Sequence, residues 1–210
     1  MIISDSSDEL AKLLYEKYIQ AKDMPRSDSP FLAAIDGPCA SGKTLLSRDI
    51  LNQLISRYGL NVGLIEIDHF FLPPGLRSET RFAEPGGNIH YERFQQEVIE
   101  PILAHQAPKY SVFDCSIMDY SGTIEVLVSD MILIEGVYSH HPLWRDELDL
   151  RIFCHANMDV RLQRLEKRDG QQKLRRFIDE WIPMEDKYFE AFDVKNKSDI
   201  IFQSGFSQLS

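Results

Sequence analysis

The 210-residue sequence contains only three cysteines, Cys39, Cys115 and Cys154, and they lie far apart in the chain. Their number is odd and no zinc-ligand spacing connects them, which argues against a disulfide framework and against a structural zinc site. Reduced thiols in a cytosolic protein are the simplest interpretation.

The sequence also lacks long apolar runs and an excess of positive charge. No stretch approaches the roughly 18–20 consecutive apolar residues of a membrane helix. The N-terminal MIISDSSDEL has neither the basic region nor the apolar core of a secretory signal. Lys and Arg number 23 against 33 Asp and Glu, for a net charge of −10. A dedicated nucleic-acid binder needs a basic surface, so we expect a cytoplasmic protein with neither nucleic-acid nor membrane partners.

What the sequence does contain is typical of a globular domain. Hydrophobic residues make up 43% and charged residues 27%, and the length favours one domain over residues 1–210. No internal repeat or low-complexity segment appears. The oligomeric state stays open, with a homo-oligomer as one option.

The segment GPCASGKT at residues 37–44 follows the apolar run FLAAID and matches the phosphate-binding loop pattern G-x-x-x-x-G-K-[ST]. Glycines allow the backbone N–H groups to turn toward a polyphosphate, and the apolar spacing after the loop predicts a helix whose N-terminus favours anions. The alternative, an ordinary glycine-rich turn, does not explain four constrained positions in eight. The expected cofactor-binding residues are Gly37, Ala40, Ser41, Gly42, Lys43, Thr44, Leu45 and Arg161.

Apolar segments alternate with helical patterns after residue 31. We predict strands at 31–36, 61–71, 131–138, 151–156 and 198–202, and helices at 4–22, 91–106, 159–170 and 174–192. Pro101 is expected to bend or end its helix, and Pro183 to interrupt another. Residues 110–129 suggest a hairpin. Continuously apolar strands indicate a mostly parallel sheet covered on both faces, so the expected fold is an α/β three-layer sandwich with ligands at the carboxyl ends of the strands.

Two carboxylates end predicted strands. Asp68 ends LIEID and is either a helix cap or a group facing the nucleotide, beside which the phosphate-binding loop is expected to lie. Glu135 ends MILIE and is either a strand-end charge or, together with Thr44, a ligand of Mg²⁺.

Arg161, Arg164 and Arg168 share one face of the helix predicted from residue 159. Such a run is often a solvated basic face. Phosphoryl transfer, however, requires positive charge over the γ-phosphate, and guanidinium groups suit that role. In an acidic chain this cluster favours a lid over residues 159–176.

Together, IDGPCASGKT, LIEIDHFF, MILIEGVY and RLQRLEKRD resemble the uridine kinase and phosphoribulokinase family of P-loop small-molecule kinases, over roughly residues 31–202. The resemblance implies a nucleoside-kinase-like P-loop NTPase fold and transfer of the ATP γ-phosphate to a hydroxyl of a small-molecule substrate, with uridine or cytidine as the leading acceptor. It also implies that Asp68 is the base, that Thr44 and Glu135 hold Mg²⁺, and that Lys43, Arg164 and Arg168 act on the transferring phosphate.

The acceptor side departs from the family pattern. Where the family has an aspartate for the ribose hydroxyls, GGNIHYERF offers Asn88 and His90, and Phe113 stands at the probable tyrosine position with no histidine after it. Residues 72–93 form the expected acceptor loop. The expected substrate-binding residues are Asp68, Arg77, Arg81, His90, Arg93 and Phe113.

Two other functions compete with nucleoside kinase activity. The arginines of the acceptor loop could serve solubility alone or fit an anionic acceptor, so a ribosylated vitamin or a sugar phosphate is an alternative. A non-catalytic nucleotide-binding regulator is disfavoured, because it would leave Asp68 and the arginine helix without a role.

Overall fold

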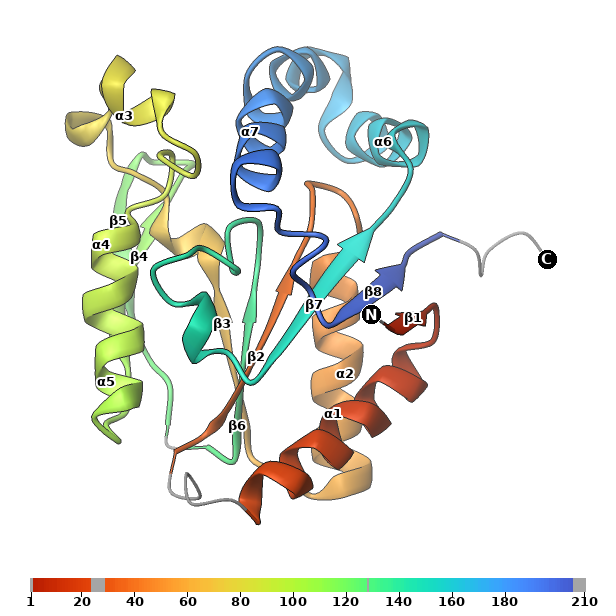
Figure 1. The fold of residues 1–210 in the computed structure, drawn as a ribbon. Helices are drawn as coiled ribbons and strands as arrows, with labels where there is room; N and C mark the ends of the chain where they lie inside the picture. The colour runs from red at the N-terminus through yellow and green to blue at the C-terminus, as the bar shows by residue number, and fades with distance from the viewer. Residues whose placement is uncertain (1, 24–28, 128, 206–210) are drawn as a thin grey trace.

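The computed structural model describes residues 2–23, 29–127 and 129–205, and a parallel six-stranded sheet forms its centre. The strand order is β1-β8-β7-β2-β6-β3 (Figure 1). The bounds are β1 (Ile2–Ser4), β2 (Phe31–Asp36), β3 (Val62–Glu66), β6 (Met131–Glu135), β7 (Leu150–His155) and β8 (Ile200–Gln203). The predicted α/β sandwich is therefore confirmed, whereas strand β1, which pairs with β8, was not predicted.

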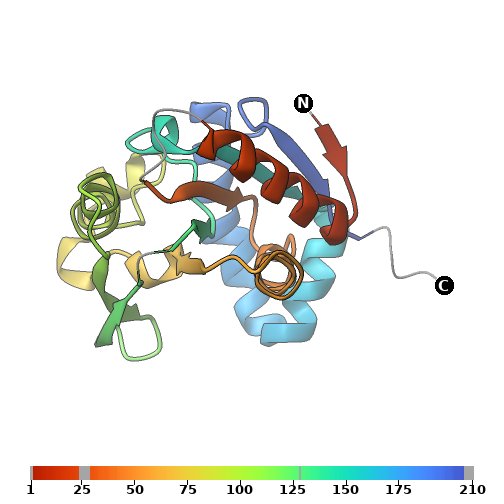
Figure 2. The same ribbon diagram turned by 90° about the horizontal axis from the view of Figure 1, so that it is seen from below.

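The apolar run FLAAID is buried on both sides because the sheet has a core on each face. Phe31, Ala33 and Ile35 point to one core, and Leu32 and Ala34 point to the other, as the alternation of side chains along a strand requires. Helices α1 (Ser7–Lys22) and α2 (Lys43–Tyr58) fill the first core. Seen from below, these two helices lie together at one side of the molecule (Figure 2).

The second core is covered by a helix that runs from Tyr91 to Leu103 and by α7 (Ile182–Phe192). The first of these consists of α4 (Tyr91–Phe94), the π-helical turn Gln95–Ile99 and α5 (Glu100–Leu103). Above the carboxyl ends of the strands lie α7 and α6 (Met158–Arg176) (Figure 1). None of the helices in the described ranges is long and apolar enough to cross a bilayer.

The helix that contains Pro101 ends close after it, at Leu103, as expected, whereas the chain stays helical through Pro183, which corrects the expected interruption there. Each proline follows a π-helical turn, Gln95–Ile99 or Phe177–Trp181, and occupies an early position of the next α-helical segment. Proline is tolerated there because its missing N–H is not needed and the wider π turn relieves the clash with the preceding carbonyl.

The long excursion after β3 is more ordered than its sequence suggested. It contains the 3₁₀ turn Pro74–Leu76 and α3 (Glu79–Ala83). Its two ends are held together: the Leu72 N–H donates to the Asn88 carbonyl (2.9 Å) and the His90 N–H donates to that of Phe70 (2.7 Å). The predicted hairpin is confirmed as β4 (Lys109–Asp114) and β5 (Asp119–Glu125), with a bulge at Val112/Phe113.

The strand order corrects one expectation about the site. The strand that leads to Asp68, β3, does not border the strand of the phosphate-binding loop, because β6 lies between them and pairs with both β2 and β3. Glu135, at the end of β6, therefore stands between the loop and the element that carries Asp68. The order of parallel strands along the chain does not determine their order in the sheet, because each crossover connection can place the next strand beside a different neighbour.

His141, in the segment after β6, stabilises the packing between α7 and the acceptor loop. Its ring stacks on Tyr91 with centroids 5.0 Å apart and lies edge-on to Phe192. Burial lowers the pKa of His141 to about 4, and the positive charges of Arg81 and Arg145 act in the same direction.

We expect this histidine to make folding stability depend on pH. A lowered folded-state pKa means that the stabilisation is present above the unfolded pKa of about 6.5 and is lost as the pH falls toward 4. The free energy of unfolding should decline over that window by about 2–3 kcal/mol from this group. Urea unfolding at pH 7 and pH 4.5 measures the decline, with His141→Phe as the comparison. An equal decline in that variant would assign the effect to other groups.

Candidate active site

The phosphate-binding loop adopts the predicted strand–loop–helix arrangement between β2 and α2. Gly42 has φ of 105° where the loop enters α2, a conformation in which a β-carbon is strained. At Gly37 (φ 141°) an added β-carbon would lie 2.2 Å from the Cys154 carbonyl oxygen. Gly42 is therefore required by its backbone conformation, and Gly37 by its conformation and by its closeness to β7.

Lys43 lies inside this loop with only 7% of its surface exposed. Its ammonium group donates to the carbonyl oxygens of Gly37 (2.8 Å) and Pro38 (3.0 Å). These bonds position a buried positive charge in the loop, where it can meet a polyphosphate.

Thr44 and Glu135 form the oxygen pair that could hold a metal. The Thr44 hydroxyl donates to Glu135 Oε1 at 3.1 Å, whereas Glu135 Oε2 is buried with no hydrogen-bond partner among the described residues. Burial, together with the nearby charge of Asp68, raises the pKa of Glu135 to about 7, and Lys43 opposes that rise.

These two residues fit Mg²⁺, which prefers oxygen ligands and usually takes only one or two from the protein, keeping waters and substrate phosphates for the rest. The described part of the chain has no group of three or more His, Cys, Asp or Glu side chains arranged to hold a metal. When bound, the ion would neutralise charge on the β- and γ-phosphate oxygens.

Asp68 lies in the 3₁₀ turn Ile67–Phe70 that follows β3. The cap position of this turn is Glu66 and no side-chain cap bond forms, so Asp68 does not act as a cap. The residue is exposed to solvent and open to a ligand, yet the protein atoms around its carboxyl raise its pKa. The charges of Lys43 and Arg168 oppose that rise, which places the carboxylate within electrostatic reach of both the loop and α6.

The three arginines of α6 have different environments. Arg161 is buried, and its Nε donates to the Cys39 carbonyl at 2.9 Å. Arg164 donates to the carbonyls of Ala40 (3.0 Å) and Ser41 (3.1 Å). Arg168 is exposed, and its Nε donates to Asp169 at 2.7 Å. Arg161 and Arg164 thus hold the loop, and Arg168 alone of the three is open to a transferring group.

This difference predicts different kinetic effects for two variants. Arg168→Ala should lower kcat by roughly 10-fold or more, because a charge facing the transferring phosphate is lost, with little change in the Kd for ADP. Arg164→Ala should weaken ADP and ATP alike, because the loop loses a brace. Calorimetric Kd values and steady-state kinetics separate the two. Lys167→Ala, an exposed neighbour, is the control, and the same profile in all three variants would leave α6 a solvated basic face.

Two of the arginines expected to bind substrate are engaged within the protein. Arg81 forms a bidentate pair with Glu92 (2.6 and 2.8 Å) and lies over the ring of Tyr91. Arg93 is buried and donates to the carbonyls of Ser111 and His69, both at 2.6 Å. These contacts favour a structural role: Arg93 joins the Asp68 turn to the hairpin.

Arg77 and His90 keep polar groups available. Nε of Arg77 donates to the Leu72 carbonyl at 2.8 Å, and its charge is felt at Cys115 on the hairpin together with that of Asp68. Cys115 is thus within electrostatic reach of both Arg77 and Asp68. His90 Nδ1 has no partner among the described residues, and burial lowers the pKa of the ring.

Phe113 is 2% exposed and packs edge-on against Tyr120, with ring centroids 5.7 Å apart. Its ring is therefore covered in this conformation. Leu45, also expected to bind the cofactor, lies in the first turn of α2 and its side chain is 72% exposed.

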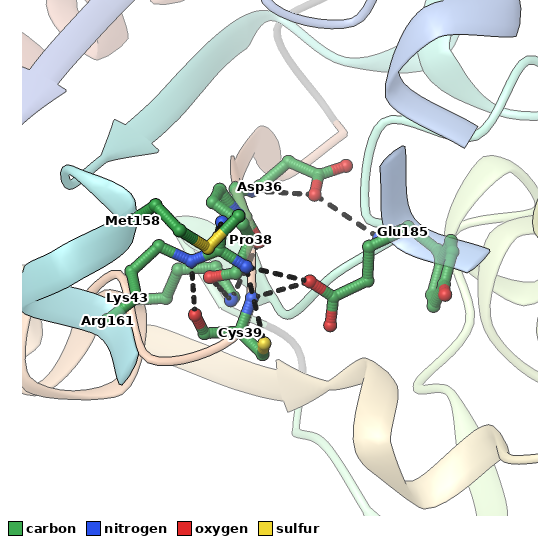
Figure 3. Close-up of polar contacts among 9 residues, drawn as sticks. Asp36, Pro38, Cys39, Lys43, Met158, Arg161 and Glu185 are labelled. Atoms are coloured by element: carbon green, nitrogen blue, oxygen red, sulfur yellow. Dashed lines mark hydrogen bonds and ion pairs between the residues drawn. The ribbon is translucent and has the colours of Figure 1, made fainter. Parts of the chain in front are cut away.

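Two acidic residues of the site were not predicted. Asp36, the last residue of β2, is fully buried and accepts from the N–H groups of Gly37 (2.7 Å) and His140 (2.9 Å) and from the Tyr188 hydroxyl (2.8 Å). Glu185 of α7 accepts from the Cys39 N–H at 2.8 Å (Figure 3). Asp36 could have been identified from the sequence, because it directly precedes Gly37 of the phosphate-binding loop. No local sequence pattern points to Glu185.

Comparison with known proteins agrees with this geometry. No protein-family model matches the chain. A uridine-cytidine kinase B of Dictyostelium discoideum is 27% identical over 203 residues, which cover 90% of this chain and 81% of the relative. The resemblance to uridine kinases seen in the sequence motifs is thus confirmed over nearly the whole chain.

Two solved structures share the fold. One is described as a possible uridine kinase from Bacillus stearothermophilus (TM-score 0.69, 21% identity, 92% of this chain and 99% of that one). The other is described as a putative fructose transport system kinase from Silicibacter sp. TM1040 (TM-score 0.71, 20% identity, 94% and 98%). At these identities the likeness establishes a P-loop kinase fold.

Proposed function

We propose that this chain is an ATP-dependent kinase that transfers the γ-phosphate to a hydroxyl of a small molecule, with a nucleoside such as uridine or cytidine as the leading acceptor. The observation that carries the proposal is the meeting of Lys43, the Thr44–Glu135 pair and Asp68 at the carboxyl edge of the sheet. The curated uridine-cytidine kinase relative supports the nucleoside.

In this mechanism the loop binds the polyphosphate through its backbone N–H groups and through Lys43. Thr44 and Glu135 would hold Mg²⁺ against the phosphates. Asp68 orients the acceptor hydroxyl and accepts its proton as the new P–O bond forms. Arg168 supplies positive charge to the transferring group. Phosphoryl transfer depends mainly on positioning and charge stabilisation, and these residues provide both.

Another acceptor is the alternative, because Asn88 and His90 stand where the uridine kinase pattern has an aspartate. Arg77 is the acceptor-loop arginine best placed to meet an anionic group, since Arg81 and Arg93 are bonded within the protein. A sugar, a sugar phosphate or a ribosylated vitamin is therefore the second candidate class.

An ADP-release assay with ATP and Mg²⁺ tests the proposal across nucleosides, sugars, ribosylated vitamins and sugar phosphates. Turnover with uridine or cytidine at least roughly 10-fold above every other acceptor would support a nucleoside kinase. A preference for another class would keep the kinase and change the acceptor. ATP binding without turnover on any acceptor would favour a nucleotide-binding regulator.

A further inference from the structure

Glu185 is a buried carboxylate beside the phosphate-binding loop that the proposed mechanism does not use. It lies on α7 and is only 5% exposed. Its Oε2 accepts from the Cys39 N–H at 2.8 Å and lies 3.5 Å from a terminal nitrogen of Arg161. A buried carboxylate is costly unless it is paired and hydrogen-bonded, and here the loop and α6 supply both partners.

Arg161 approaches the same loop residue from the other side. Its Nε donates to the Cys39 carbonyl at 2.9 Å, and one terminal nitrogen lies 3.4 Å from Cys39 Sγ. Figure 3 shows Arg161 and Glu185 converging on Cys39 from opposite sides. Both backbone polar groups of Cys39 are thus taken up by these two side chains.

Arg161 lies near the start of α6, within the segment 159–176 that is expected to act as a lid, and Glu185 lies beyond the end of that segment, on α7. Between them, Leu165, Phe177 and Ile182 form a small core that packs against Cys39 and Ala40 of the loop. Tyr188, one turn along α7, adds its bond to Asp36. The base of the lid is therefore fastened to the loop.

The first part of α6 is a continuous helix from Arg161 to Arg168. Arg168 lies seven positions after Arg161, which is about two helical turns or about 10 Å, and the helical conformation first breaks at Gly170 (φ 80°, ψ 167°). The direction in which Arg168 points is thus set by how Arg161 and Arg164 are held.

We propose that Glu185 is a positioning residue for phosphoryl transfer: by holding both the Cys39 N–H and Arg161, it orients α6 so that Arg168 faces the transferring group. This inference rests on the proposed kinase function. Glu185 acts through Arg161 and α6 and is not assigned a contact with the reacting atoms.

A double-mutant cycle tests the proposal. Glu185→Gln keeps the size and an oxygen that can accept from Cys39 but removes the charge that pairs with Arg161. It should lower kcat by roughly 10-fold with less than about a 3-fold change in the KM for ATP. In an Arg168→Ala background the same change should cost less than about 2-fold, because the group being positioned is already absent.

Glu190→Gln is the matched control, since Glu190 is an exposed carboxylate on the same helix, and it should leave kcat unchanged. An unaltered kcat in Glu185→Gln overturns the proposal. Equal losses with and without Arg168 also overturn it, because they indicate a structural role only. If Glu185→Gln does not fold, Glu185→Asp, which retains the charge on a shorter side chain, replaces it in the cycle.

Amide hydrogen exchange of residues 158–169 in the nucleotide-free protein provides a readout independent of activity. Glu185→Gln should speed exchange there by at least roughly 10-fold, whereas Glu190→Gln should not. If the wild-type protein phosphorylates no acceptor but this difference appears, the kinase proposal fails while the anchoring stands. Unchanged exchange in Glu185→Gln overturns the anchoring itself.

Discussion

Replacing Lys43 with alanine is expected to lower kcat/KM for ATP by roughly 10²–10³-fold, the scale on which loss of one preorganised donor to a developing charge acts. The ammonium group lies in the loop and is bonded to the carbonyls of Gly37 and Pro38. Its removal takes away the positive charge that meets the β- and γ-phosphates. Steady-state kinetics with ATP as the varied substrate measure the loss.

Two further variants separate charge from packing. Lys43→Met keeps the apolar stem of the buried side chain and removes only the charge, so it should lose as much activity as alanine does. Lys167→Ala removes an exposed lysine of α6 and should behave like the wild type. Normal kcat and KM in the Lys43 variants would contradict the assignment of this loop to ATP.

Asp68→Asn is expected to lower kcat by roughly 10²-fold or more, the usual scale for a positioned general base. Asparagine keeps the shape and hydrogen bonding of the side chain but lacks its negative charge and basicity. The carboxylate is exposed to an incoming acceptor and within electrostatic reach of Lys43 and Arg168. ATP affinity should change little, because Thr44 at the start of α2 and Glu135 at the end of β6 would carry most of the metal binding.

The comparison that decides the role of Asp68 is between kcat and the binding of ATP with Mg²⁺. A parallel loss of both would make Asp68 a metal ligand, and full activity would leave it without a catalytic role. Asp49→Asn, which changes an exposed carboxylate on α2, controls for the loss of one negative charge.

The features that could be predicted from the sequence are those whose residues lie close together in the chain. The loop from Gly37 to Thr44 has its required glycines, lysine and threonine within eight positions, and the strand before it and the helix after it were visible as apolar patterns. The continuous apolar strands predicted a parallel sheet because both faces of that sheet must be covered. Strand β1 escaped prediction, since three residues are too few for a pattern and its partner β8 begins at Ile200.

The binding partners of charged residues could not be predicted from residue type alone. The arginines at 81, 93 and 161 were expected to meet a substrate or the cofactor, but their guanidinium groups bond to Glu92, to the Ser111 and His69 carbonyls, and to Cys39. A guanidinium has five donors that many acceptors can satisfy, so its partner depends on what the fold brings near it.

By itself, then, the sequence determined the phosphate-binding loop, the carboxylate Glu135 at the end of its strand and the class of the fold, because each depends on backbone conformation or apolar periodicity over a few residues. It did not determine that Asp68 lies in a 3₁₀ turn after β3 and not at the end of a strand. Only the tertiary structure decided that β6 separates the loop from Asp68, that Arg168 stays open while Arg161 and Arg164 brace the loop, and that Glu185 is bonded to Cys39. Those outcomes depend on strand order and on contacts between residues more than a hundred positions apart, for which a single sequence carries no periodic signal.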